Sequence, residues 1–203
     1  MIIKHTIRDL ISKIDWEAFF IEWKFHKRFA SVANLQGCDV VRASWLTDFE
    51  EKDRAKASKA MQLLKEAYRI IEQLDKDYEI TTLHKSTPAL PASLQELVAI
   101  EPTQVPYILM VAVADPEIDS LYENDEHNKK IVETVTKRLV DAAILASREQ
   151  IDDSLHSFAI DPRTRKPELW KQLDDLLGFS KIGVSVSKDG NLLPMSAQCA
   201  IIM

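Results

Sequence analysis

Four aromatic side chains near the N-terminus are spaced as on one face of a helix. They fall at positions i, i+3, i+4 and i+7 of one stretch: Trp16, Phe19, Phe20 and Trp23. Asp15 precedes them, and a short carboxylate there can accept hydrogen bonds from the free N–H groups of a first helical turn. The pattern predicts a short helix whose aromatic face packs against the rest of the chain.

Two longer stretches repeat apolar residues at helical spacing. The first predicts a helix over 49–76, introduced by the capping-box pair Thr47 and Glu50, with an apolar face of Ala57, Ala60, Met61, Leu64, Ala67, Tyr68, Ile71 and Leu74. The second predicts a helix over 126–150 with a core line of Ile131, Val135, Leu139, Ala142 and Ala146. Asp125 or Asn128 is the expected cap of this second helix.

Strands are expected at three places. Residues 79–83 are rich in Ile and Thr, and residues 107–114 form a continuous apolar run between prolines, which favours a strand buried on both faces. Near the C-terminus, residues 182–187, a Lys-Asp-Gly-Asn turn and residues 198–202 predict a hairpin.

Shorter helices fill much of the remaining chain. Their expected positions are just after Thr6, at 93–99 with Ser93 as cap and Leu94, Leu97 and Val98 inward, after Asp115-Pro116 through Leu121 and Tyr122, and from Pro167 to a stop at Gly178. Residues 24–46 are expected to be irregular and residues 151–166 to form a polar loop. Few strands separated by helices of unequal length indicate an α+β fold, and 203 residues suit one domain spanning 1–203.

Composition and charge exclude several functions. The net charge of −6, with no dense basic cluster beyond residues 163–166, disfavours nucleic-acid binding. Only four glycines occur, and they are scattered, so neither a P-loop nor a GxGxxG nucleotide fingerprint is present. Two distant cysteines, the lack of an export signal and the lack of a long apolar run favour a cytoplasmic protein with reduced thiols.

No catalytic motif stands out among the polar residues. The five histidines never pair at metal-ligand spacing, and no Gly-x-Ser-x-Gly elbow is present. The pairs Asp152-Asp153 and Asp174-Asp175 are adjacent, so on a helix their side chains diverge, and solvated surface charge is the favoured interpretation. The residues alone indicate a soluble α+β domain.

Three segments carry a resemblance to a known family. They are Ile14-Asp15-Trp16-x-x-Phe19-Phe20-x-x-Trp23, then Asn124 to Ala142 with Asn128-Lys129, Arg138-Leu139 and Asp141, and finally Ile182-Gly183-Val184…Leu193-Pro194…Ala200-Ile201-Ile202. In this order and spacing they resemble the activation domain of cobalamin-dependent methionine synthase, and most closely its short standalone members.

The resemblance implies a fold and a function. The fold would be a C-shaped single domain with a bent antiparallel sheet, two long helices and several shorter ones. The function would be to assist reactivation, by reductive methylation, of the cobalamin of a separate methionine synthase or corrinoid methyltransferase. S-adenosylmethionine would be the methyl donor, the partner would hold the cobalamin, and a flavodoxin-type protein would serve as reductant. In such a system the cofactor carries the chemistry and the protein positions the donor.

The resemblance also implies which residues form the site. The methyl-donor loop of the family corresponds to residues 156–162, which assigns cofactor-binding roles to Ser157, Phe158 and Ala159, with Arg163 just beyond. Glu72 corresponds to an acidic residue that holds the charged amino end of the ligand. The loop lacks the glycine, the tyrosine and the preceding arginine of the family pattern. An alternative function is therefore a non-catalytic module that binds a corrinoid protein and has lost S-adenosylmethionine binding.

Overall fold

The chain folds around one five-stranded antiparallel sheet. A computed structural model describes residues 1–35, 39–92, 94–95, 106–161 and 166–203. The strand order is β1-β2-β3-β7-β4, with bounds Ile2–Thr6, Glu79–Thr87, Tyr107–Ala114, Gln198–Ile202 and Ser157–Ile160 in that order. β3 lies in the middle and is almost entirely buried, as its apolar sequence predicts. The predicted strand at 79–83 is confirmed and extends to Thr87.

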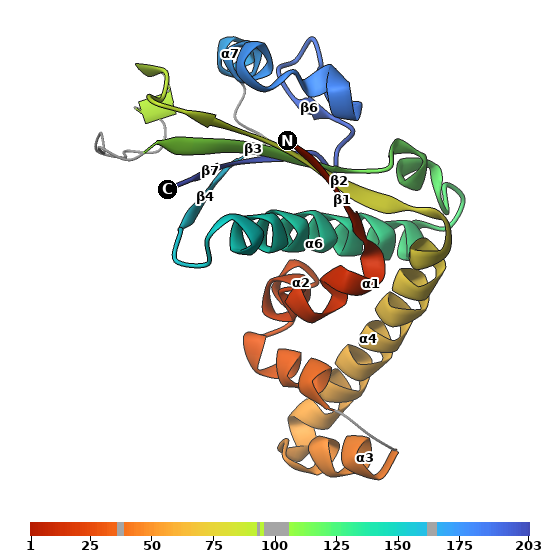
Figure 1. Ribbon diagram of the computed structural model, residues 1–203. Helices are drawn as coiled ribbons and strands as arrows, with labels where there is room; N and C mark the ends of the chain where they lie inside the picture. Colours follow the sequence, from red (N-terminus) through yellow and green to blue (C-terminus); the bar gives the residue numbers. More distant parts are fainter. Residues whose placement is uncertain (36–38, 93, 96–105, 162–165) are drawn as a thin grey trace.

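Different helices cover the two faces of the sheet (Figure 1). Alternate residues of β3 and β7 point to opposite faces because a strand has a side-chain period of two. Met110, Ala112 and Ala200 pack on the face covered by α6 (Glu126–Ile151). Leu109, Val111 and Ile201 pack on the face covered by α7 (Pro167–Leu177). The small residues on the first face let the long helix approach closely.

The N-terminal segment builds a helical layer beside α6. Its helices are α1 (Ile7–Leu10), η1 (Ile11–Lys13), α2 (Trp16–Glu22), η2 (Lys27–Asn34), α3 (Asp39–Thr47) and α4 (Glu51–Asp77). The predicted caps are confirmed at three places: Thr6 accepts from the N–H of Asp9, Asp15 from Ala18 and Asp125 from Asn128. Helix α4 reaches well beyond the sheet, and α3 lies at its far end (Figure 1).

The aromatic helix α2 is a packing element, as its spacing predicts. Phe19 and Phe20 are fully buried, while Trp16 and Trp23 are partly buried against the same core cluster. Trp16 and Phe20 each meet Phe19 edge to face, with ring centroids 5.4 and 5.5 Å apart. Such arrangements place the positive edge of one ring on the negative face of the next.

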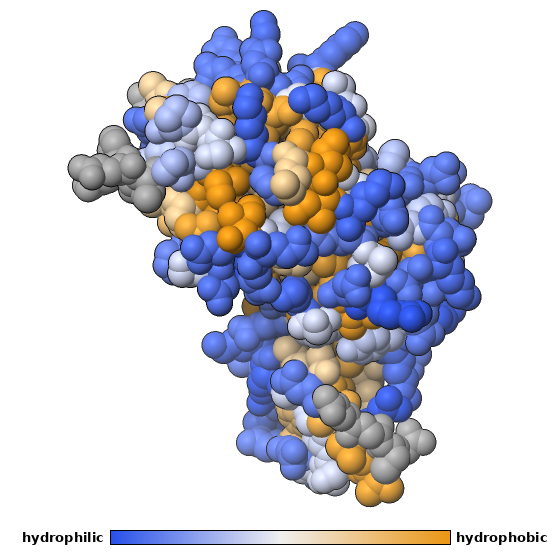
Figure 2. Space-filling model, viewed as in Figure 1, coloured by the Kyte–Doolittle hydropathy of each residue, from blue (hydrophilic) through white to orange (hydrophobic). Residues whose placement is uncertain are grey.

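The surface is mostly hydrophilic, with limited apolar areas. Figure 2 shows apolar surface over the sheet half of the molecule and at the end where α3 lies; Val40 and Val41 of that helix are exposed. Among the described residues, no helix combines the length and the apolar character needed to cross a bilayer.

The α+β class, the antiparallel sheet and the two long helices are confirmed. The predicted helix from Pro167 is confirmed too, and Gly178 ends it with a φ of 79°. After Asp115 the structure forms the 3-10 helix η3 (Pro116–Ser120), a shorter element than predicted. Most of the helix predicted at 93–99 lies outside the described residues; Leu94 is buried.

Two predictions in the N-terminal half are wrong. Residues 24–46 are largely helical, since they contain η2 and most of α3. Phe29 and Val32 share one face of this 3-10 helix, and two buried positions in eight residues are too few to establish a helical period from the sequence. Thr47 does not cap α4: it ends α3, its hydroxyl donates to the Ser44 carbonyl (2.6 Å), and α4 starts after Glu50 without a side-chain cap.

Two predictions in the C-terminal part are also wrong. The predicted polar loop over 151–166 contains β4, a short edge strand whose exposed residues lack an alternating pattern. The C-terminal turn does form a hairpin, but it joins β5 (Ser185–Val186) to β6 (Leu192–Leu193). Strand β7 pairs instead with β3 and β4, because its apolar residues on both faces are buried only inside the main sheet.

Candidate functional site

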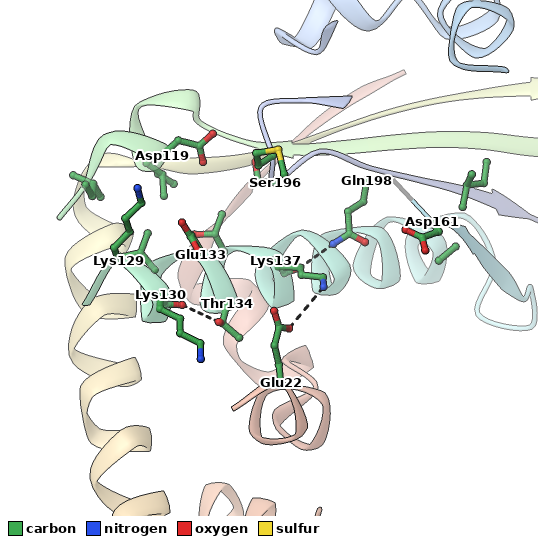
Figure 3. A pocket seen from close by; sticks show the side chains of 17 residues that line it. Glu22, Asp119, Lys129, Lys130, Glu133, Thr134, Lys137, Asp161, Ser196 and Gln198 are labelled. Carbon is green, nitrogen blue, oxygen red and sulfur yellow. Dashed lines mark hydrogen bonds and ion pairs between the residues drawn. The ribbon is translucent and has the colours of Figure 1, made fainter. Parts of the chain in front are cut away.

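A cavity of about 690 Å³ lies between α6 and the sheet (Figure 3). Helix α6 forms one wall, and η3, the start of β7 and the end of β4 form the others. The lining residues are Glu22, Ile118, Asp119, Leu121, Lys129, Lys130, Val132, Glu133, Thr134, Thr136, Lys137, Ala159, Ile160, Asp161, Met195, Ser196 and Gln198. This volume is in the range of small-molecule sites.

The sequence places these side chains through three local features. Helix α6 presents Lys129 to Lys137 along a length of about 12 Å, since a helix rises about 1.5 Å per residue. The Ala197 N–H donates to the Pro194 carbonyl (2.9 Å), a turn that presents Met195 and Ser196 before β7 begins. The four-residue pairing of β4 with β7 fixes Ala159 opposite Ala200 on the α6 side of the sheet.

A network of polar contacts borders the cavity near α2. Glu22 lies 3.7 Å from Lys137 and 3.6 Å from Arg138, and Arg138 lies 3.2 Å from Asp141. Gln198 donates to the Lys137 carbonyl (3.4 Å) and also hydrogen-bonds to Asp141. These contacts join α2, α6 and β7, which are far apart in the sequence.

Asp141 has an unusual electrostatic environment. Burial raises the pKa of its carboxyl group above the ordinary value, although Arg138 and Lys137 and the hydrogen bond from Gln198 oppose the shift. Asp15 adds a second negative charge that raises the pKa further. Arg138, 3.2 Å away, already supplies the cationic partner of this carboxyl group.

The aromatic helix also contributes to the cavity wall. The ammonium group of Lys130 lies 4.3 Å from the centroid of the Trp23 ring, a cation–π contact. The backbone carbonyl of Lys130 accepts from Thr134 (2.8 Å; Figure 3). The C-terminal end of α2 therefore contacts two lysines that line the cavity: Glu22 faces Lys137, and Trp23, which caps the helix, faces Lys130.

The end of the cavity near η3 combines apolar and acidic groups. Ile118 and Val132 are buried there, and Asp119 lies beside them. Burial raises the pKa of Asp119, and a hydrogen bond from the Met195 backbone partly offsets the shift. Lys129 and Glu133 also line the cavity (Figure 3), so both signs of charge are available along it.

Two buried hydroxyl groups belong to residues that line the cavity. Thr136 Oγ1 and Ser196 Oγ have no hydrogen-bond partner within the described part of the chain. Buried polar atoms without partners are uncommon, because each costs about 1–3 kcal/mol. These atoms mark the sheet-facing wall of α6 and the turn before β7 as places where the protein's own hydrogen bonding is incomplete.

The structure brings few of the predicted site residues together. Ala159 lines the cavity, and Ser157 lies on the same face of β4 but outside the lining. Phe158 pairs with Ile201, so it lies on the opposite, α7-facing side of the sheet. Glu72 is exposed on α4 and does not line the cavity, and Arg163 lies outside the described residues.

Sequence reasoning missed the network around Asp141. Asp141 served there only as part of a matching segment, and Glu22, Lys137 and Gln198 were not singled out. One signal was available for Asp141: it is an acidic residue on α6 directly before buried Ala142 and Ala143. In the described ranges, no group of three or more His, Cys, Asp or Glu residues could hold a metal ion.

Comparison with known proteins supports the resemblance. The family model described as "Vitamin B12 dependent methionine synthase, activation domain" matches residues 6–92. A solved structure, "Crystal Structure of the MetH Reactivation Domain bound to AdoHcy", aligns with a TM-score of 0.66 at 13% identity, covering 100% of this chain and 77% of that one. The resemblance to the activation-domain family is confirmed. A comparison with curated proteins gave no match.

The family match covers the N-terminal part of the chain, and the structural likeness covers all of it. The family match spans the aromatic helix and α4, whereas the structural likeness extends the activation-domain fold over α6, β4 and β7. At 13% identity the likeness shows the fold and not the ligand. The cavity lies in the part that only the structural likeness covers, apart from Glu22.

Proposed function

We propose that this activation-domain-like protein assists the reductive methylation of cobalamin held by a separate methionine synthase or corrinoid methyltransferase. Its cavity would bind S-adenosylmethionine and present it to that partner. The observation that carries the proposal is that one segment both corresponds to the family's methyl-donor loop and lines the cavity. The segment that corresponds to the family's methyl-donor loop, residues 156–162, supplies Ala159, Ile160 and Asp161 to the cavity wall.

The residues present suit the chemistry of S-adenosylmethionine. This ligand carries a positive sulfonium centre and an α-amino acid with both an ammonium and a carboxylate group. The cavity offers carboxylates at Asp119, Glu133 and Asp161 and ammonium groups at Lys129 and Lys137. Ile118 and Val132 provide apolar surface for a heterocycle. A cavity with mixed charge and an apolar wall suits a ligand that carries both signs of charge and an apolar ring system.

The chain's own residues would bind and orient the donor. Gln198, fixed by Asp141 and the Lys137 carbonyl, presents a polar edge at the sheet side. Glu22 of α2 lies near Lys137 and Arg138, so α2 contributes a negative charge to the α6 wall. When bound, S-adenosylmethionine would supply a methyl group to the partner's cobalamin after a reductant has delivered one electron to cob(II)alamin, and S-adenosylhomocysteine would be released. The contribution of this protein is the positioning of the donor.

A reconstitution assay tests this function. The chain is mixed with the cobalamin-binding module of a methionine synthase in its cob(II)alamin state, a chemical reductant and S-adenosylmethionine, and methylcobalamin is followed by its absorption. We expect methylcobalamin to form faster with the chain than without it, and Gln198→Leu to remove most of the gain. An equal rate without the chain would contradict the proposal.

One observation favours the second candidate, a corrinoid-protein-binding module without a methyl donor. Phe158, the one aromatic residue of the altered loop, lies on the sheet face opposite the cavity. Co-elution of the chain with the cobalamin-binding module separates the candidates. If the complex forms and no S-adenosylmethionine binds at millimolar concentration, the second candidate holds.

A further inference from the structure

Strand β4, which forms part of the cavity wall, is held in place by few interactions. β4 is four residues long and, among the described strands, pairs only with β7. The pairing is continued for one step by His156 and Met203, whose backbone groups exchange hydrogen bonds of 2.7 and 3.0 Å. Three of the four residues are exposed, so side-chain burial adds little. A short edge strand held mainly by backbone pairing is prone to fraying.

Arg148 binds the backbone just before this strand. It lies in the last turn of α6, and its Nη1 donates to the carbonyl of Leu155 (2.9 Å). The side chain is 18% exposed, so the contact is largely shielded from water. A hydrogen bond from a charged donor is stronger than a neutral one, and shielding strengthens it further.

The guanidinium group is itself held in place. Its Nη2 lies 3.7 Å from Glu149 Oε1, and the other carboxylate oxygen of Glu149 contacts Lys13 of η1. A planar guanidinium can donate a hydrogen bond from one nitrogen while another nitrogen faces a carboxylate, which one ammonium group on a flexible stem does less well. Arg148 thus connects the Leu155 carbonyl to a charge pair that joins α6 to the N-terminal layer.

The turn between α6 and β4 does not replace this contact. Asp152 ends the helix, and its Oδ1 accepts from the Ser154 N–H (2.9 Å) and the Ser154 hydroxyl (2.7 Å). These bonds shape the turn internally and do not reach β4. In the described part of the turn, the side-chain bond that ties Leu155 to α6 is that of Arg148.

We infer that Arg148 is a positioning residue that fixes β4, and with it Ala159, at the wall of the cavity. The inference rests on the proposed function only where it concerns ligand affinity. Leu155 precedes β4, and neither Arg148 nor Leu155 lines the cavity. Arg148 therefore acts through the backbone of β4 and not on the ligand.

Amide hydrogen exchange resolved by NMR tests this inference without any ligand. In Arg148→Gln we expect exchange at residues 156–160 to accelerate at least tenfold, while exchange in α4 and β3 changes less than twofold. Arg148→Lys should give an intermediate rate. The control is Arg8→Gln, which removes an arginine of α1 that pairs with Asp75 of α4 (3.2 Å) and should leave β4 unchanged.

Two results would overturn the inference. One is exchange in β4 that does not differ between Arg148→Gln and Arg8→Gln. The other is an equal acceleration in all elements, which would make Arg148 a general stability residue; if the Gln variant does not fold, Arg148→Lys is judged by the same criteria.

A calorimetric titration with S-adenosylmethionine then links Arg148 to the cavity. We expect Arg148→Gln to raise the dissociation constant at least fivefold, and an unchanged constant would contradict the link. If the unmodified chain gives no heat, the proposed function fails, while the exchange rates still decide the role of Arg148.

Discussion

Helix α2 and strand β4 both border the same cavity, yet they are stabilised in different ways. Helix α2 has its own cap at Asp15 and two fully buried rings, Phe19 and Phe20. Strand β4 has one buried residue, Ile160, and depends on β7 and on Arg148 for its position. One wall is thus fixed by local sequence and core packing, and the other by partners distant in the sequence.

The difference indicates where the protein can vary. Changing α2 disturbs the core, whereas the exposed positions of β4 can change with little effect on folding. This agrees with the sequence, in which the aromatic segment keeps the family pattern and residues 156–162 depart from it. Binding properties are therefore expected to depend on β4 and its neighbours, and stability on α2.

The largest expected effect is on stability at α2. Phe20→Ala removes a side chain with 0% exposure and should lower the free energy of unfolding by about 3–5 kcal/mol in a denaturant titration. The matched change in β4, Phe158→Ala at 39% exposure, should cost about 1 kcal/mol or less. Equal losses in the free energy of unfolding at both positions would show that α2 and β4 are stabilised in the same way.

A second prediction concerns binding at β4. Ala159→Arg introduces a long charged side chain at the cavity wall and should weaken S-adenosylmethionine binding at least tenfold, about 1.4 kcal/mol, by calorimetry. Phe158→Arg places the same side chain on the opposite face of the strand and is the control. If the control weakens binding as much as Ala159→Arg, the ligand is not on the α6 side.

Removal of the α2 cap should have a moderate effect. Asp15→Ala eliminates the hydrogen bond from the Ala18 N–H (2.9 Å) and should destabilise the protein by about 1 kcal/mol. Asp15→Asn keeps an acceptor at the cap and should recover most of that loss in the same thermal melts. If Asp15→Asn loses as much stability as Asp15→Ala, the effect comes from the charge of Asp15 and not from the hydrogen bond.

The smallest expected effect is a pH dependence of stability at His5, which lies where the sheet packs against α6. His5 is 5% exposed, and its Nε2 lies 2.9 Å from Ser147 Oγ and 3.2 Å from Thr82 Oγ1. Burial lowers the pKa of His5, partly opposed by Asp9, so folding favours the neutral ring. Its contribution is complete above the unfolded pKa of about 6.5 and declines as the pH falls below that value.

Thermal melts between pH 7.5 and 5.5 measure this contribution. The unmodified chain should lose more stability over that interval than His5→Gln, which cannot be protonated there. Parallel curves for the two proteins would mean that His5 does not titrate differently on folding.

The sequence predicted the parts of the fold that follow local rules. The long helices, the central strand and the caps at Thr6, Asp15 and Asp125 follow from periodicity and from side-chain chemistry within a few residues. The 3-10 helix η2 could not be predicted because only Phe29 and Val32 of its eight residues are buried, and β4 could not be predicted because its pairing with β7 creates it.

The site could be predicted only in part. Ala159 came from the resemblance, and the structure places it at the cavity. The contacts among Glu22, Arg138, Asp141 and Gln198 join three segments separated by more than fifty residues each, and no local pattern encodes such a meeting. Phe158 and Ala159 are neighbours in the sequence, but the alternation of a strand puts them on opposite faces.

We propose that the cavity between α6 and the sheet binds S-adenosylmethionine, and a titration of the isotope-labelled chain followed by amide NMR is the decisive experiment. We expect saturable shifts at Lys137, Ala159, Ser196 and Gln198 below millimolar ligand, and their absence in Ala159→Arg. No shifts at millimolar ligand, or shifts confined to α3 and the far end of α4, would contradict it.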